Sequence, residues 1–397
     1  MNPARLPRLL RDQSLSALAA GLVTVLVGFA SSVAIVFQAA QALGATPAQT
    51  ASWMWALGIG MGATCIALSL RWKMPVVTAW STPGAAVLVA GAAGVSMDEA
   101  VAGFILAGLL VVLAGFSGIF ERMLGRMPLP LAAAMLAGVL LRFCIDAFAA
   151  VQVQPVLVLA MLAAYFAARR WWPRYAVILT LLAGVAVAGA AGLMHLEGLR
   201  LELARPVWTT PRASLAAVLG VALPLFVVTM ASQNVPGVAA IRASGYPVPV
   251  SPAIGWTGVA TVLLAPFGAF SLNLAAITAA ISMGPEAHPD PAKRYMAAVW
   301  AGVFYLLVGL FGATVAALLA AFPRELVLAL AGIALLGTFG GSLATAVRDE
   351  SEREPALVAF LVTASGMALL GIGAAFWGLV AGALVRLFLH RPRTRPP

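Results

Sequence analysis

Hydroxyl, proline and glycine residues interrupt an apolar run in the first half of the sequence. Ser81 and Thr82 stand directly before Pro83 and Gly84. A hydroxyl can cap the free N–H groups of a helix whose first turn contains proline. A helix that starts inside an apolar run exposes N–H donors and the positive end of its dipole, and both attract an anion. Glycine lets the backbone approach a ligand closely, so Ser81, Thr82 and Gly84 are candidate substrate-binding residues.

A second stretch of the same character covers residues 265–276. At a shift of 190 residues, Ser81 falls on Ser271 in this stretch. Broken helices at matching positions of two half-chains are typical of the binding site of a transporter. Ser271 and Asn273 can either cap the second half-helix or contact a ligand directly. Phe270 is a candidate apolar wall for a ring, with ordinary packing as the alternative.

Gln233 and Asn234 form the best amide cluster within an apolar segment. Both offer hydrogen-bond donors and acceptors, and the following Pro236 and Gly237 would let the helix unwind locally. Polar side chains of this kind also join neighbouring helices inside membranes. We favour a binding role, because the internal repeat places this segment beside the second broken one. Ser31 is the first-half candidate, and close helix packing explains it equally well.

Acidic residues are absent from both broken stretches and from the segments centred near residues 28 and 224. A site built from helix N-termini and neutral amides suits a small carboxylate, whereas a neutral polar ligand would call for a carboxylate acceptor. Membrane enzymes need clustered acids around a metal, or a histidine beside a carboxylate. The histidines His195, His288 and His390 stand in loops or the tail, so we expect neither an enzyme nor a cofactor. Arg142 and Asp146, one helical turn apart, predict an ion pair, with a proton relay as the alternative.

The composition is that of a polytopic membrane protein. Of 397 residues, 62% are hydrophobic and 10% are charged, and the mean hydropathy is +1.00. Such a chain requires a lipid bilayer around it. The net charge of +10 does not indicate nucleic-acid binding, because the charges stand at the ends of apolar runs rather than in a basic stripe.

Fourteen apolar segments form two sets of seven, separated by residues 194–212. They centre near residues 28, 60, 84, 107, 138, 161 and 184, and near residues 224, 259, 277, 306, 335, 362 and 380. The segments near 84 and 277 are short, as half-helices would be. Fourteen crossings put nineteen of the 24 Lys and Arg on the side of the termini, four opposite and one within a segment. Both termini are therefore expected in the cytoplasm.

The two halves also echo each other outside the broken stretches. At a shift of 201 residues, Ala30-Ser31 matches Ala231-Ser232 and Gly44 matches Gly245. Because seven is odd, the second copy must enter the membrane from the opposite side. The predicted fold is therefore an all-α membrane protein of two inverted seven-segment repeats, as in many secondary transporters.

Several motifs together resemble the benzoate/proton symporter (BenE) family. They are Gly28–Ser32, Ser81–Gly84, Asn273–Ile281 and Gly284–Pro291, the last followed by Arg294-Tyr295. The resemblance covers nearly the whole chain. It implies an importer of benzoate or a similar aromatic carboxylate in a bacterial inner membrane, driven by the proton gradient. It also implies the seven-plus-seven inverted-repeat fold shared with nucleobase and sulfate/bicarbonate transporters.

That fold implies two bodies. Residues 1–120 and 201–322 would form a core that holds substrate, and residues 121–200 and 323–397 would form a gate. Short strands would precede the half-helices, near Val76–Thr78 and Phe267–Phe270. Relatives of the fold often pair through their gates, which leaves a homodimer open.

The resemblance leaves substrate and mechanism with alternatives. Nucleobase relatives carry acids in segments 8 and 10, where this chain has Gln233 or Asn234 and Asn273. The proton would then travel on the substrate, as neutral benzoic acid, or on another residue. A nucleobase transporter, an inorganic-anion transporter and a passive anion channel are the alternative functions.

Overall fold

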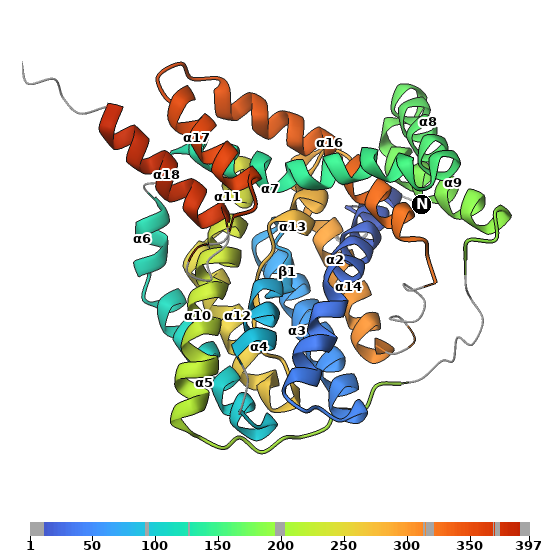
Figure 1. The fold of residues 1–397 in the computed structure, drawn as a ribbon. Helices are drawn as coiled ribbons and strands as arrows, with labels where there is room; N and C mark the ends of the chain where they lie inside the picture. The colour runs from blue at the N-terminus through green and yellow to red at the C-terminus, as the bar shows by residue number, and fades with distance from the viewer. Residues whose placement is uncertain are drawn as a thin grey trace, which may run out of the picture.

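The computed structural model describes residues 12–91, 95–125, 128–194, 203–312, 314, 321–367, 369 and 374–389, which are almost entirely helical (Figure 1). In the first half the elements are α2 (Leu15–Ala42), α3 (Pro47–Trp72), β1 (Thr78–Trp80), α4 (Thr82–Gly91), α5 (Met97–Phe116), α6 (Ile119–Gly125), α7 (Leu129–Ala149), α8 (Pro155–Trp171) and α9 (Ala176–Ala190). In the second half they are α10 (Leu223–Thr229), α11 (Val235–Ala243), α12 (Val250–Leu264), β2 (Leu272–Leu274), α13 (Ile277–Met283), α14 (Tyr295–Leu310), α16 (Arg324–Val347), α17 (Arg353–Ala364) and α18 (Ala374–Leu389).

The chain is a mostly helical, multi-pass membrane protein. Within the described ranges, five helical stretches are long and apolar enough to cross a bilayer. They are Pro47–Trp72, Met97–Phe116, Leu129–Gln152, Ala217–Ala243 and Val250–Phe267, and the bent pair within α16 would add a sixth. A helix also lies at each of the fourteen predicted centres, but most are too short to count as spans by this measure. The number of crossings therefore stays a prediction.

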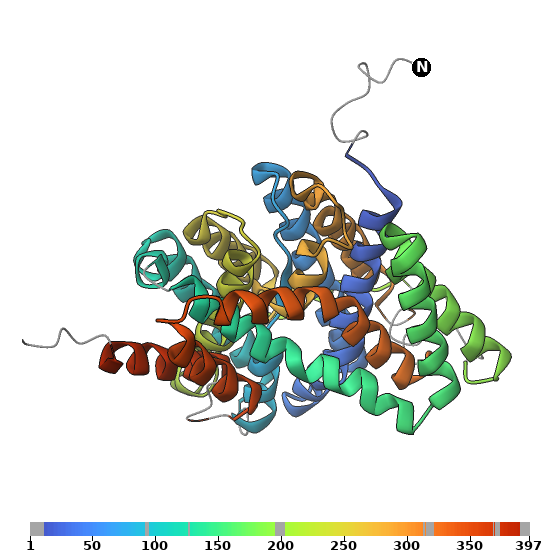
Figure 2. The same cartoon turned by 90° about the horizontal axis from the view of Figure 1, so that it is seen from above.

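The helices pack in two groups. In the first, α3 packs on α14, α5 packs on α12, and α2 lies against α4, α13 and α14. In the second, α7 packs on α16 and α17, α8 on α9, and α17 on α18. The helices α7 and α16 run side by side and cross over the group that contains α2, α3 and α14 (Figures 1 and 2). The names core and gate are used below for the first and the second group, while their separate functions and the predicted boundaries at residues 120, 200 and 322 stay predictions.

Packing partners repeat between the two halves. Counting the predicted segments, α3 on α14 is the second segment on the eleventh, and α12 on α5 is the ninth on the fourth. Seven segments separate each segment from its repeat counterpart, so the second corresponds to the ninth and the eleventh to the fourth. The two pairs are therefore counterparts of each other. In the same way α8 on α9 corresponds to α17 on α18, and α7 packs on its own counterpart α16. The helix packing is therefore equivalent when the two halves are exchanged.

Glycines bring the paired helices of the core into backbone contact. A Cβ on Gly58 of α3 would lie 2.4 Å from Cα of Gly309 in α14. The equivalent contact joins Gly115 of α5 to Gly255 of α12, where a Cβ on Gly115 would lie 2.4 Å from the backbone nitrogen. Contacts this short leave no room for a side-chain layer between the helices. Each pair is therefore held together as one unit.

The interrupted segments meet in a two-stranded antiparallel ladder. Thr78 pairs with Leu274, Ala79 with Asn273 and Trp80 with Leu272. Two further backbone bonds extend it, from Ser81 N to Ser271 O at 3.2 Å and from Ala275 N to Val77 O at 2.9 Å. Equivalent strands that run in opposite directions are what inverted repeats require.

Both strands lie later in the sequence than Val76–Thr78 and Phe267–Phe270, where the resemblance had placed them. The segment Ala265–Phe267 forms a 3₁₀ turn instead, and Gly268 ends it with φ 105°. A Cβ on Gly268 would lie within the Trp53 ring system, so this position requires glycine for both its backbone conformation and its packing. The chain becomes extended only after this turn.

The first segment of the second half is continuous, with two wide turns. Ala217–Ala222 and Met230–Asn234 are π-helical and alternate with α10 and α11. Pro236 and Gly237 lie within α11, so they do not unwind the helix as predicted. The ring of Pro236 removes one N–H donor and crowds the preceding turn, and a widened turn just before it accommodates both effects.

Candidate functional site

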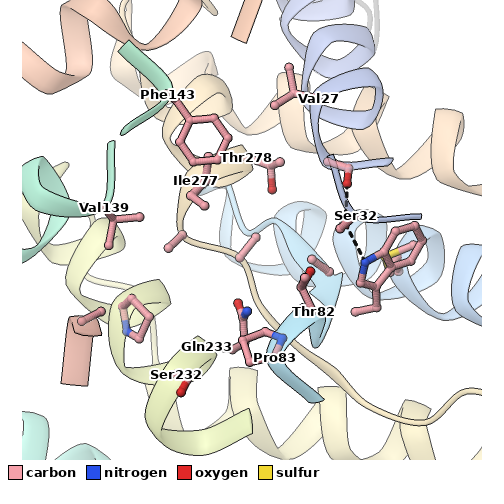
Figure 3. Close-up of a pocket in the computed structure, with 18 of the residues that line it drawn as sticks. Val27, Ser32, Thr82, Pro83, Val139, Phe143, Ser232, Gln233, Ile277 and Thr278 are labelled. Atoms are coloured by element: carbon pink, nitrogen blue, oxygen red, sulfur yellow. Dashed lines mark hydrogen bonds between the residues drawn. The ribbon is translucent and has the colours of Figure 1, made fainter. Parts of the chain in front are cut away.

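A cavity of about 350 Å³ lies between the core and the gate (Figure 3). Its core wall comes from α2, β1, α4, the π turn before α11, α13 and α14, and its gate wall from α7 and α18. The lining residues are Val27, Gly28, Ser32, Met61, Ala79, Trp80, Thr82, Pro83, Val139, Phe143, Ser232, Gln233, Pro236, Ala275, Ala276, Ile277, Thr278, Tyr305 and Ala375. The volume accommodates one small aromatic molecule.

Both half-helices begin at this cavity. Thr82, the first residue of α4, and Ile277, the first residue of α13, are lining residues. The two helices differ in how their starts are capped. Ser81 Oγ accepts a hydrogen bond from Gly84 N at 3.1 Å, whereas α13 has no capping side chain. The first-turn N–H groups of α13 therefore find no side-chain partner among the described residues, and they remain available to an anion.

Polar side chains line the cavity next to both helix starts and form its polar wall. Thr82, Gln233 and Thr278 all line it, and Figure 3 shows Gln233 beside Pro83. Ser32 has partners already, because its hydroxyl donates to Gly28 O at 2.8 Å and accepts from Trp80 Nε1 at 2.9 Å. Thr82, Gln233 and Thr278 are thus the side chains best placed to contact a ligand.

The lining residues from α7 and α18 form an apolar wall. Val139 and Phe143 project from α7, and Ala375 comes from α18. Figure 3 shows the Phe143 ring on the side of the cavity away from Gln233 and Pro83. A ligand with one polar end and one flat apolar end would match this division of the walls.

Charged residues do not line the cavity, since no Asp, Glu, Lys or Arg occurs among the lining residues. In the described ranges, no three His, Cys, Asp or Glu side chains are grouped so that they could hold a metal ion. Among the lining groups, helix ends and amide groups are therefore the ones that could attract an anion.

Two of the candidate residues taken from the sequence, Thr82 and Gln233, line the cavity. Those that do not are Ser81, Gly84, Asn234, Phe270, Ser271 and Asn273, all of which are buried behind it. Ser31 lies on α2, but its side chain is outside the described residues. The sequence analysis considered Ser32 together with Ser31, but it did not single out Phe143 or Thr278. Thr278 lies in the first turn of the half-helix that the sequence predicted, and this position could have identified it as a candidate binding residue.

A hydroxyl cluster lies beneath the cavity where the two strands end. Thr229 Oγ1 donates to Ser81 Oγ at 3.1 Å and lies 2.9 Å from Ser271 Oγ. All three side chains are buried. Thr229 thereby fastens α10 to both interrupted segments at once, and Ser81 and Ser271 act as parts of the scaffold.

The two asparagines also face the scaffold. Asn234 Oδ1 accepts from Leu274 N at 3.0 Å, and its amide nitrogen donates to the Met230 sulfur at 3.2 Å. Asn273 is fully buried, and both of its side-chain polar atoms have no partner among the described residues. It lies opposite Ala79 in the ladder, so the two side chains share one face of the strands, and Ala79 lines the cavity.

Phe270 belongs to an aromatic cluster rather than to the cavity. Its ring centroid lies 5.7 Å from that of Trp53 and 6.3 Å from that of Phe104, and the side chain is fully buried. Gly84 is a packing position too, since a Cβ there would lie 2.6 Å from Leu225 Cδ1.

The predicted ion pair in α7 is present. Arg142 Nε lies 3.7 Å from Asp146 Oδ2, and the two side chains are 79% and 36% exposed. An exposed pair of this kind adds little stability.

Comparison with known proteins decides the family. The model of a family described as "Benzoate membrane transport protein" (BenE) matches residues 11–388. The chain belongs to this family. It is 50% identical over 373 residues to the inner membrane protein YdcO of Escherichia coli K12, covering 94% of this chain and 95% of that one. It is 40% identical over 388 residues to the benzoate membrane transport protein of Acinetobacter baylyi, covering 98% of each.

One solved structure shows a similar fold. The structure of SLC26A9 aligns with a TM-score of 0.52 at 11% identity, over 96% of this chain and 66% of that one. The transmembrane domain of the cyanobacterial bicarbonate transporter BicA aligns with a TM-score of 0.45 at 16% identity, over 94% of this chain and 96% of that one. As a member of the BenE family, the chain is a transport protein and not an enzyme.

Proposed function

We propose that this protein imports benzoate or a similar aromatic carboxylate across the bacterial inner membrane as a proton symporter. One observation carries the proposal: the starts of both half-helices line a single cavity that has no charged side chain and one apolar wall. The names of the two relatives, an inner membrane protein and a benzoate transport protein, agree with it.

The carboxylate would bind at the polar wall. The uncapped first turn of α13 offers N–H donors, and Thr82, Gln233 and Thr278 add side-chain groups. A charge at a helix end gains about 0.3–1 kcal/mol when exposed and up to about 2 kcal/mol when partly buried. Two helix ends and a few hydrogen bonds can therefore replace an arginine here.

The ring would contact the gate wall of Val139, Phe143 and Ala375. Ser81, Asn234, Phe270 and Ser271 would hold the two strands in place behind the site. Because the ligand touches both core and gate, its binding would bias their relative position, which is the requirement for alternating access. Both termini would lie in the cytoplasm, and the pairing of two copies through the gate stays a prediction.

The test uses purified protein in liposomes with labelled benzoate. An inward proton gradient should drive accumulation above equilibrium, and a protonophore should abolish it. Accumulation that ignores the gradient removes the symport claim, and equilibration without accumulation indicates a channel. No uptake of labelled benzoate, together with uptake of labelled uracil or sulfate, would assign a different substrate. Gln233→Ala, which truncates a lining side chain, should weaken benzoate binding. Thr363→Val, at a buried threonine that does not line the cavity, is its control.

A further inference from the structure

A second hollow, of about 550 Å³, lies at the opposite end of α13 from the cavity. One side belongs to α8 and the start of α9, and the other to the loop that follows α13. Its lining residues are Tyr165, Arg169, Trp172, Pro173, Tyr175, Ala176, Pro285, Glu286 and Pro289. The seven residues of α13 separate the two spaces by about 10 Å at 1.5 Å per residue. A ligand that leaves the cavity along this half-helix would arrive in the hollow.

The lining of the hollow differs from that of the cavity, because it contains a cation. Arg169 is 49% exposed, and around it stand the rings of Tyr165, Trp172 and Tyr175. The guanidinium Nη1 also donates to the Tyr165 hydroxyl at 2.5 Å, and Cζ lies 5.7 Å from the centroid of that ring. A guanidinium beside aromatic faces and prolines matches a flat aromatic ring that carries one carboxylate.

In the structure, the Arg169 guanidinium is paired with a carboxylate of the protein itself. Glu286 Oε1 lies 3.8 Å from Arg169 Nη1, and 13% of the Glu286 side chain is exposed. On its other side, a Cβ on Gly337 of α16 would lie 2.7 Å from the same oxygen. At 3.8 Å the pair is an ion pair without a hydrogen bond. By contrast, Glu352 pairs with Arg386 at 2.7 Å within the gate.

The loop that carries Glu286 is fixed to the core. Arg294 donates to His288 O at 2.7 Å and to Met283 O at 2.9 Å, and Tyr246 donates to Pro291 O at 3.1 Å. Glu286 therefore moves with α13, whereas Arg169 moves with the gate.

Several charged or titratable groups surround Glu286. Arg169 and Tyr165 face it from α8, and Arg294 acts on it from its own loop. Tyr175 shares the hollow, His288 and Asp290 are exposed on the loop, and α16 presents Gly337, which has no charge. Burial raises the pKa of Glu286 above its usual range, although the two arginines act in the opposite direction. Protonation near neutral pH is thus easier here than for an exposed glutamate.

We propose that the hollow is a second binding site for an aromatic carboxylate, in which Arg169 takes the ligand's carboxylate and Glu286 is the competing anion that keeps the site empty until it is protonated. The inference rests on the proposed function. When neutral benzoic acid reaches the hollow, its proton passes to a carboxylate oxygen of Glu286, and the resulting benzoate pairs with Arg169. Loss of the proton to the aqueous side lets Glu286 return to Arg169 and expel the ligand. One proton and one benzoate leave together.

The test counts benzoate sites on the purified full chain by equilibrium dialysis at pH 6 and pH 8. An ordinary carboxylic acid ionises near about pH 4, so benzoate itself stays charged at both values. Wild type should show the second site at pH 6 and lose it at pH 8. Glu286→Gln should show it at both, with binding at pH 8 strengthened at least about tenfold, equivalent to one pKa unit. Arg169→Gln should remove the second site and keep the first.

Matched variants and a direct label separate the possible results. Arg170→Gln, at the exposed neighbour that does not line the hollow, and Asp290→Asn, in the same loop, should both behave as wild type. A photoactivatable azidobenzoate should label residues 165–176 or 285–289 in Glu286→Gln but not in Arg169→Gln. One site at every pH in Glu286→Gln, with no label in these ranges, overturns the inference alone. Absence of binding in every variant overturns the proposed function instead.

Discussion

The backbone N–H of Ser81 donates to the carbonyl of Ser271 at 3.2 Å. The same two residues correspond in the sequence at a shift of 190. The matching bond at the other end of the ladder runs from Ala275 N to Val77 O at 2.9 Å, so the paired strands correspond at a shift of 194 and Ser81 takes the place of Ala275 rather than of Ser271. The ladder therefore joins the two interrupted segments, and α4 begins at Thr82 directly after β1, whereas α13 begins at Ile277, three residues after the end of β2.

Gln233 and Asn234 are adjacent but should respond differently to alanine. Gln233→Ala should weaken benzoate binding by about 1 kcal/mol, the usual net contribution of a hydrogen bond, and leave thermal stability unchanged. Asn234→Ala leaves Leu274 N without its buried partner and should cost about 1–3 kcal/mol of stability. Binding isotherms and thermal unfolding of both variants check this. Equal loss of affinity with unchanged stability would place Asn234 in the site as well.

Thr229→Val should destabilise the protein, because it removes the hydroxyl that contacts Ser81 and Ser271. The expected cost is about 1–3 kcal/mol, measured as a lowered unfolding temperature in detergent. Thr180→Val is the matched control, since Thr180 is equally buried but bonds only to Ala176 O of its own helix. If both variants unfold at the same temperature, the hydroxyl cluster does not fasten α10 to the strands.

Asn273→Leu should raise stability while it lowers transport. The asparagine amide is fully buried and has no hydrogen-bond partner among the described residues. Replacing it by an apolar side chain of similar size removes the cost of burying an unpaired polar group. Retention of a costly residue is expected at functional positions rather than in ordinary packing. Unfolding temperature and liposome uptake are measured on the same preparation. A less stable variant would show that Asn273 has a partner in the folded protein.

Gly58→Ala should prevent close packing of α3 and α14. The added methyl would lie 2.4 Å from Gly309 Cα, and overpacking of this kind costs about 1–3 kcal/mol or more. Gly340→Ala is the control within another helix, where no atom lies within 4 Å of the added Cβ. Yield of monodisperse protein and unfolding temperature should fall for the first variant only.

Glu286→Gln should stabilise the protein at alkaline pH. Burial raises the pKa of this carboxyl, so the folded state disfavours its ionised form. The wild type therefore loses stability as pH rises through the raised pKa, and it shows no such penalty below the ordinary glutamate value of about 4.3. The unfolding temperatures of variant and wild type should differ at pH 8 and converge near about pH 4.5. A difference of the same size at both values would assign the effect to packing.

Much of the fold followed from the sequence. Hydropathy located a helix at every predicted centre, and the paired interruptions at Ser81 and Ser271 predicted the meeting of two half-helices. The second strand, β2, lies later than predicted because the 3₁₀ turn at residues 265–267, ended by Gly268, depends on packing against Trp53. Local composition carries no trace of that contact.

The candidate site was predictable by segment but not by side chain. Residue type cannot show whether a polar group points into a cavity or into the scaffold behind it, so Thr82 and Ser81 looked equivalent. The π turn at residues 230–234 decides that Gln233 lines the cavity while Asn234 bonds to β2. The gate residue Phe143 gave no signal, because its contact with the core is long-range and its segment reads as ordinary apolar helix.

The two walls of the cavity would contact different parts of the ligand, and this determines which part of the substrate specificity a mutation can change. Under the proposed function, the negative end of the ligand is held largely by main-chain amides, which no substitution other than one by proline removes. The ring meets Val139, Phe143 and Ala375, three side chains on a separate body. Natural drift or laboratory evolution at those three positions can retune the size and shape of the acid that is carried, while the demand for an anionic head is inherited unchanged.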